Sequence, residues 1–301
     1  MILMTREKKE QYIERMEDSA RKQSQWRDVF RRLFRNKLSV VGLIIVLLIV
    51  LAVVFAPLLT RYDYGKQDPG NRLAFPSFQH LCGTDNFGRD IFSRLLYGGR
   101  ISLLVSLMAV ALSMGVGVIL GSLAGLFGGT VEVIIMRFMD IIMAVPQLLL
   151  MIALSSALGD GLLNTAVACS FGGLPSATRL LRATVLTIRD QEFVEAAIAT
   201  GSTKMRLIFR HIIPNTIAPL IVDTTLRIGG TIMAISGLSF VGLGVQPPTP
   251  EWGSILSSSL NYIRDFYPLV LFPGLLMMLT LFGFSVFGDG LRDALDPKMK
   301  D

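Results

Sequence analysis

The chain has 301 residues, of which 51% are hydrophobic and 17% charged, with a net charge of +6 and a mean hydropathy of +0.55. A soluble domain of this length would not be so apolar, so the composition excludes an ordinary soluble protein and favours one embedded in a membrane. The two cysteines, Cys82 and Cys169, have no metal-ligand spacing and support neither a metal site nor a disulfide framework.

The first 37 residues form a basic tail with eleven Lys/Arg and six Asp/Glu. Near its end, five apolar residues recur at helical spacing with arginines on the opposite face: Trp26, Val29, Phe30, Leu33 and Phe34. Such a helix is expected to lie in the headgroup layer of an anionic leaflet, so membrane lipid is a predicted partner. A nucleic-acid-binding arm is the alternative, but the tail leads directly into a membrane span. No cleavable signal peptide is expected, because the first apolar run starts after residue 37.

Six apolar stretches are long enough to cross a bilayer core of roughly 30 Å. They lie at residues 38–59, 101–131, 133–158, 161–178, 216–243 and 266–288. The charges inside them form two pairs, Arg137 with Asp140 and Asp223 with Arg227, each three or four residues apart on one helical face. We interpret each as an internal ion pair that offsets its own burial, with a role in translocation as the alternative.

The distribution of Lys and Arg predicts that both termini lie in the cytoplasm. The basic tail and loop 184–214, with four Lys/Arg, would share that side, and an even number of spans ties the two termini together. Residues 60–100 are an exception, with six basic and four acidic residues. We expect a cytoplasmic tail, a first span, an extracytoplasmic loop, a five-helix core and a second cytoplasmic tail at residues 1–37, 38–59, 60–100, 101–290 and 291–301.

Two segments on the predicted outer side have clear turn signals. Gly83 and Gly88 allow turns, after which Asp85 or Asp90 can cap a helix that starts at Ile91. Further on, Gly242 and Gly244 end the fifth span, and three prolines then force an extended stretch that leads to Trp252. A tryptophan at this place suits the membrane interface.

A polar, mostly basic island at 191–215 separates two apolar runs and reads as two short helices. Gly201 stands where a left-handed turn would end the first helix, and Ser202 or Thr203 can cap the second. Pro214 is expected to stop the second helix and to begin the next apolar segment. The island is either an ordinary solvated loop or a compact knob that docks a partner protein.

The sequence contains no recognisable motif for ATP binding or for catalysis. It lacks the phosphate-binding pattern G-x-x-x-x-G-K-[ST], since its one Gly-Lys pair, Gly65-Lys66, is followed by Gln67. No HExxH, GxSxG or Cys/His cluster occurs, so we predict no catalytic, metal or cofactor site. Uphill transport would need a partner or an ion gradient. An ion-coupled secondary transporter and a channel are the alternative classes.

Several of these segments resemble the permease subunits of ABC importers. Glu195-Ala196-Ala197, Gly201 and Ile213-Pro214 look like the EAA coupling loop, and the ending from His211 to Asn215 is similar to the peptide, nickel and glutathione branch. Cys82 and Ser236-Gly237 depart from that branch's pattern. The further matching segments are Gly83-Thr84-Asp85 with Gly88-Arg89-Asp90, residues 137–146, 238–255 and 288–297.

The resemblance implies an all-α integral membrane protein with six transmembrane helices, the transmembrane domain of a type I ABC importer in a bacterial or archaeal cell membrane. It implies a coupling loop at 189–214 that docks separate ATPases, which bind ATP and magnesium and drive alternating access. The implied partners are a second homologous permease, two ABC ATPase subunits and an extracytoplasmic solute-binding protein, with peptides as cargo and nickel or glutathione as alternatives. The implied coupling residues are Glu195, Ala196, Ala197, Gly201, His211 and Pro214.

Overall fold

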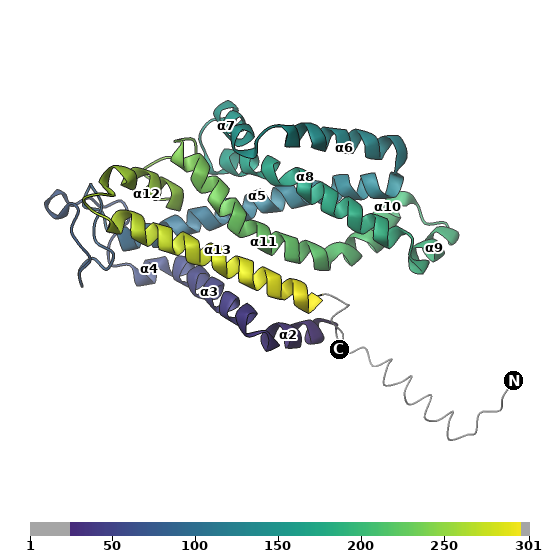
Figure 1. The fold of residues 1–301 in the computed structure, drawn as a ribbon, viewed down its shortest axis with the longest axis horizontal. Helices are drawn as coiled ribbons and strands as arrows, with labels where there is room; N and C mark the ends of the chain where they lie inside the picture. The colour runs from purple at the N-terminus through teal and green to yellow at the C-terminus, as the bar shows by residue number, and fades with distance from the viewer. Residues whose placement is uncertain (1–24, 296–301) are drawn as a thin grey trace, which may run out of the picture.

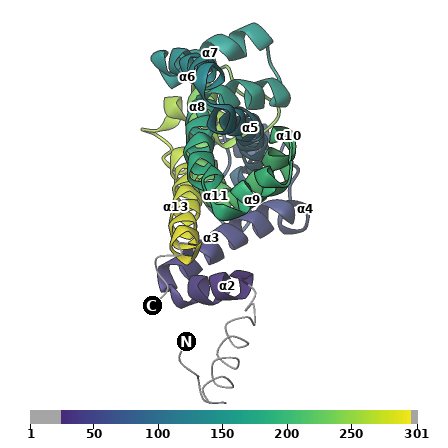
Figure 2. The same ribbon diagram turned by 90° about the vertical axis from the view of Figure 1, so that its right-hand side faces the viewer.

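A computed structural model describes residues 25–295, and within this range the chain is helical with no strand. The long helices run along the length of an elongated molecule (Figure 1), and the end-on view places α6 and α7 on the side opposite α2 and α3 (Figure 2). The helices are α2 (Gln25–Arg35), α3 (Lys37–Val54), α4 (Ala56–Leu59), η1 (Pro69–Asn71), α5 (Ile91–Phe127), α6 (Gly129–Ala144), α7 (Gln147–Leu158), α8 (Leu162–Arg189), α9 (Glu192–Ala199), α10 (Lys204–Leu207), η2 (Ile208–Ile212), α11 (Ile213–Phe240), α12 (Trp252–Ser259), η3 (Leu260–Tyr262) and α13 (Pro268–Leu295).

Four of the described helical segments are long and apolar enough to cross a membrane: α3, α5, the continuous run Lys204–Phe240, and α13. α6 and α7 make a fifth candidate if they count as one span, although they are bent by 93°. The predicted count of six is therefore not confirmed. Residues 161–178 open α8, but that helix continues to Arg189 and gains three arginines on the way. The cytoplasmic placement of both termini stays a prediction.

The bend between α6 and α7 has a local cause. Residues 133–158 were expected to form one helix, but Val145 is extended (ψ 129°) and Pro146 begins the new direction. Proline lacks an N–H group and disfavours helical geometry in the residue before it.

The segment before α5 confirms the predicted turns and cap. Gly83 and Gly88 have φ of 82° and 75°, and the Asp90 carboxylate accepts a hydrogen bond from the Ser93 N–H at 2.7 Å. Asp85, the other candidate cap, does not cap α5; its carboxylate accepts hydrogen bonds from the N–H groups of Phe87 and Arg89 within the loop. α5 therefore begins ten residues before the apolar run that starts at 101.

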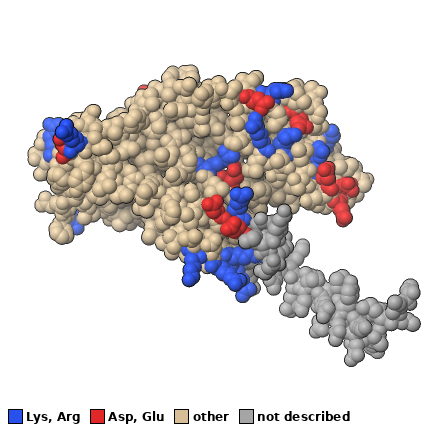
Figure 3. Space-filling view, in the orientation of Figure 1, with Lys and Arg blue, Asp and Glu red and all other residues tan. Residues whose placement is uncertain are grey.

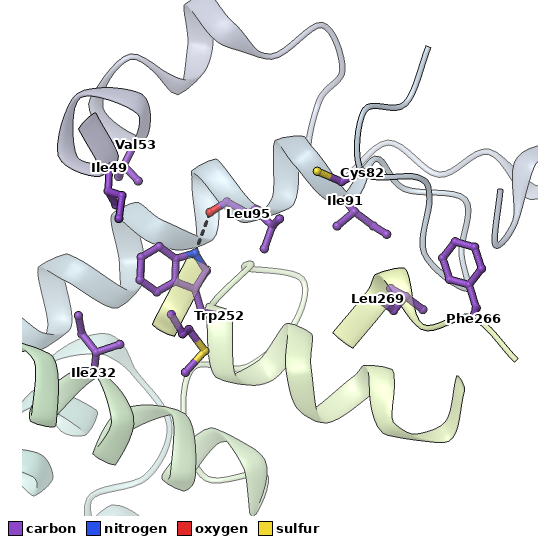
Figure 4. Packing of buried hydrophobic residues seen from close by; sticks show 10 residues of the cluster. Ile49, Val53, Cys82, Ile91, Leu95, Ile232, Trp252, Phe266 and Leu269 are labelled. Carbon is purple, nitrogen blue, oxygen red and sulfur yellow. Dashed lines mark hydrogen bonds between the residues drawn. The ribbon is translucent and has the colours of Figure 1, made fainter. Parts of the chain in front are cut away.

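Trp252 lies in the interior of the helix bundle. Its side chain is fully buried, and its indole N–H donates to the Leu95 carbonyl at 2.8 Å (Figure 4). Val53 and Gly99 border the ring. Position 99 needs a glycine, because a Cβ there would lie 2.8 Å from the indole. Through this contact α12 packs back against α5.

The amphipathic helix near the N-terminus is confirmed as α2. Its Leu33 is buried against Leu291 and Ala294 of α13, whereas Phe30 and Phe34 remain exposed. The placement of Phe30 and Phe34 in a lipid headgroup layer stays a prediction, and the Trp26 side chain lies outside the described part.

Among the described helices, α5 and α8 share the most extensive contact, and α5 turns a glycine toward α8 at every fourth residue. A Cβ on Gly117, Gly121 or Gly125 would lie 2.6–2.8 Å from the Cβ atoms of α8 residues, which is closer than real Cβ contacts. The opposing residues are Ala177, Leu181 and Val185. The spacing is that of the small-residue motifs through which membrane helices approach closely.

We expect Gly121→Ala to lower thermal stability in detergent, because overpacking a tight contact costs about 1–3 kcal/mol. Gly115→Ala is the matched control on the same helix, since a Cβ there meets nothing within 4 Å. The control should be neutral or slightly stabilising, as alanine favours helix by about 1 kcal/mol over glycine. Equal melting temperatures for the two variants would contradict the close contact.

We expect the Cys82 thiol to resist alkylation in the folded protein. Burial, with the nearby Asp90 carboxylate, raises the pKa of Cys82 to about 11. At pH 8 only about one thiol in a thousand would be the reactive thiolate. Maleimide labelling of a Cys169→Ala variant should therefore be slow until the protein is denatured, and should quicken as the pH rises toward 11. Rapid labelling at pH 7 would contradict this burial.

Candidate functional site

Residues 189–214 form a compact projection, called here the terminal knob, at the end of the molecule opposite the loops of residues 60–90 (Figure 1). α8 enters it, α9 and α10 build it, and α11 leaves it. The two predicted short helices are thus confirmed as α9 and α10.

The knob has its own small apolar core. Val194 and Ala197 of α9 pack with Leu207 and Ile212 against Val185 and Ile188 of α8. Ala197 is only 8% exposed, whereas Glu195 and Ala196 are exposed. Of the Glu195-Ala196-Ala197 triplet, two residues therefore face outward and the third supports the knob from within.

Gly201 ends α9 as predicted, with φ +83°. The N–H of Gly201 donates to the Ile198 carbonyl at 2.9 Å, and the N–H of Ser202 donates to the Ala197 carbonyl at 3.0 Å. This paired pattern satisfies the last carbonyls of the helix and requires a left-handed residue at Gly201. Of the two candidate caps for α10, Thr203 is the one used, since its hydroxyl accepts from the Arg206 N–H.

Pro214 does not stop the second helix, contrary to the prediction. The chain stays helical from Lys204 to Phe240 and passes through a π-helical turn at Ile208–Ile212. In that turn the Ile213 N–H donates to the Ile208 carbonyl, five residues back. The wider turn just before Pro214 offers a physical reason, since a proline in a regular α-helix interior clashes with the preceding turn.

The outward surface of the knob mixes exposed apolar side chains with charges. Glu195, Ala196, Gly201 and Pro214 are exposed, and His211 is half-buried within the π turn. Figure 3 shows acidic side chains at this end of the molecule, where α9 carries Glu192 and Glu195. The large apolar side chains exposed on the knob are Phe193, Ile198, Met205 and Phe209.

The knob is tied to the end of α5 as well as to α8. The Arg189 guanidinium donates to the Gly125 carbonyl at 3.2 Å, and the Lys204 ammonium lies 4.7 Å from the centre of the Phe127 ring. Sequence reasoning missed both contacts, which join residues more than sixty positions apart and leave no local pattern.

Ion pairs also join α6 to α8. The predicted pair of Arg137 with Asp140 is confirmed at 3.6 Å, and Asp140 also accepts from Arg179 of α8 at 2.6 Å. Arg182 of α8 pairs with Glu132 of α6 in the same way, donating from Nε at 2.7 Å. Two of the three arginines of α8, Arg179 and Arg182, are therefore paired with carboxylates of the neighbouring helix α6.

A second feature is a cavity of about 240 Å³ between α5, α7, α8 and α11. The predicted pair of Asp223 with Arg227 is confirmed on α11, and Arg227 faces this cavity. Small and polar residues make up most of the wall. They are Ala109, Val110, Ser113, Gln147, Cys169, Gly172, Gly173, Ser176, Gly230, Thr231 and Ala234.

Comparison with known proteins gives a consistent result. Residues 117–301 match the family model of the binding-protein-dependent transport system inner membrane component, and residues 24–76 match the N-terminal TM domain of oligopeptide transport permease C. The dipeptide transport system permease protein DppC of Alkalihalophilus pseudofirmus is 47% identical over 94% of this chain and 93% of its own length. The di/tripeptide permease DppC of Pseudomonas aeruginosa is 42% identical over 91% of this chain and 93% of its own length. The oligopeptide permease OppC of Bacillus subtilis is also 42% identical, over 92% of this chain and 91% of its own length.

The neighbouring alanines of the knob make a matched pair for mutation. We expect Ala197→Asp to loosen the knob, because burying an unpaired carboxylate costs at least about 3 kcal/mol. Ala196→Asp should leave the knob folded, since its side chain is exposed. Limited proteolysis in detergent would show faster cleavage within 189–214 for the first variant alone. Equal cleavage of the two variants would contradict the burial of Ala197.

Proposed function

The chain belongs to the family of binding-protein-dependent transport system inner membrane components, and from this membership we propose that it is a membrane-spanning subunit of an ATP-driven peptide importer. The peptide cargo rests on the names of the relatives, which are dipeptide, di/tripeptide and oligopeptide permeases. The chain would act in a cell membrane as a multi-pass protein.

The observation that carries the proposal is the terminal knob. Its apolar residues pack against α8, and Arg189 ties it to the end of α5. Its exposed large apolar side chains are Phe193, Ile198, Met205 and Phe209. Exposed apolar side chains gathered with charges are typical of a protein-protein contact surface. We propose that this surface seats on an ATPase subunit.

Within that contact, the exposed residues have distinct roles. Glu195 and Ala196 lie on the outward side of α9, and Gly201 turns the chain without adding a side chain that would hold a partner away. His211 and Pro214 lie at the π turn where α10 passes into α11. Ala197 serves the contact indirectly by keeping α9 seated on α8.

The proposed mechanism is alternating access. Two ATPase subunits bind ATP and magnesium, and their closure moves the knob. Because the knob is held by Arg189 and Lys204 as well as by its core, that movement passes to α5 and α8 and reaches the cavity they line. A second homologous permease would complete the route, and a solute-binding protein would deliver cargo from outside.

Gly201→Asp tests the docking role. A Cβ at Gly201 meets nothing within 4 Å, and aspartate is among the residues that tolerate a left-handed backbone, so the folded chain should accept the change. We expect membrane insertion to persist while ATP-dependent peptide uptake and co-purification of the ATPases are lost.

Gly242→Asp is the matched control. Gly242 follows the end of α11 with φ +83°, has open space around it and closes its helix with the same pair of backbone hydrogen bonds, but it lies outside the knob. Uptake should be retained in that variant. Normal uptake with Gly201→Asp would count against docking at the knob, and loss of uptake with both variants would point to a general folding effect.

A further inference from the structure

The groove between α8 and α11 contains two hollows in series. The 240 Å³ cavity is bordered by residues up to Ser176 on α8 and from Arg227 onward on α11. A second hollow of about 480 Å³ begins one turn further along, at Leu180 on α8 and Asp223 on α11, and reaches Arg292 of α13. The pair of Arg227 with Asp223 therefore stands between the two hollows.

Arg227 is held in one orientation by both helices. Its Nε donates to the Asp223 carboxylate, and its Nη1 donates to the Ser176 hydroxyl at 2.9 Å and lies 3.5 Å from the Gly173 carbonyl. Among the described residues, none accepts a hydrogen bond from the Nη2 group. A guanidinium fixed in this way on a cavity wall is pre-organised to bind a carboxylate.

The other arginines of this region do not border the cavity. Arg179 and Arg182 are directed to carboxylates of α6, and neither borders the cavity. Arg137 is 78% exposed and pairs with Asp140 on its own helix. Of the residues that line the cavity, Arg227 is the one with a charged side chain.

We propose that the 240 Å³ cavity receives cargo and that Arg227 binds a carboxylate of that cargo, the C-terminal carboxylate in the case of a peptide. This inference rests on the proposed function. The small residues of the wall leave room for a peptide backbone, and Ser113, Gln147 and Thr231 supply hydrogen-bonding groups for it. Asp223 stays as the resident counter-ion, so the incoming carboxylate is held weakly enough to leave again.

The test compares one peptide in two forms, dialanine with a free carboxylate and dialanine C-terminal amide, both radiolabelled. Uptake is measured in cells that express the whole transporter with wild-type or variant chain. Arg227→Gln should lower the ratio of acid to amide uptake at least about tenfold, since a hydrogen bond to a charged group commonly contributes that much. Arg137→Gln, which removes a paired arginine away from the cavity, should leave the ratio as in the wild type.

Uptake of the amide reports folding and coupling of each variant independently of the carboxylate. If Arg227→Gln fails to accumulate in the membrane, Arg227→Lys keeps a positive charge beside Asp223 and should lower the ratio by a smaller factor. An unchanged ratio, or an equal loss of both peptides, would overturn the role of Arg227 while leaving the importer intact. Absence of wild-type uptake of either form would overturn the peptide cargo and this inference with it.

Discussion

The close approach of α5 and α8 is the contact on which the rest of the structure depends. Glycines at every fourth residue of α5 let the two backbones lie side by side, and a Cβ at any of them would collide with α8. In a membrane, where apolar burial does not drive helices together, such close packing supplies much of the association. The middle of α8 lines the cavity and its last residue enters the terminal knob, so this contact fixes both functional regions relative to each other.

The parts of the site that were predictable from sequence depend on neighbouring residues. Gly201 as a left-handed cap, Asp90 as a helix cap, and the pair of Asp223 with Arg227 all follow from residues within a few positions. The burial of Trp252 and of Ala197 depends on helices distant in the chain, so it was not predictable from local pattern. The glycine spacing of α5 was visible in the sequence and could have indicated the contact with α8.

The predicted number of six spans is not confirmed for a related reason. α8 looks too charged for a membrane helix when it is taken alone, yet Arg179 and Arg182 are paired with carboxylates of α6. The cost of a charge in an apolar environment falls when a partner lies on the adjacent helix, which hydropathy along one segment does not register. On the face in Figure 3, charged side chains lie at the left end and from the centre to the right end, with a broad uncharged band between them.

The π turn at Ile208–Ile212 holds one residue more than a regular α-helical turn would, and it lies within the knob, between α10 and the part of α11 that carries Arg227. Each residue of an α-helix advances the chain by about 100° around its axis. A change of that turn between five-residue and four-residue hydrogen bonding would therefore swing Arg227 by roughly a quarter of a circle relative to α10. Through such a change, a movement of α10 would be converted into a rotation of α11 about its own axis.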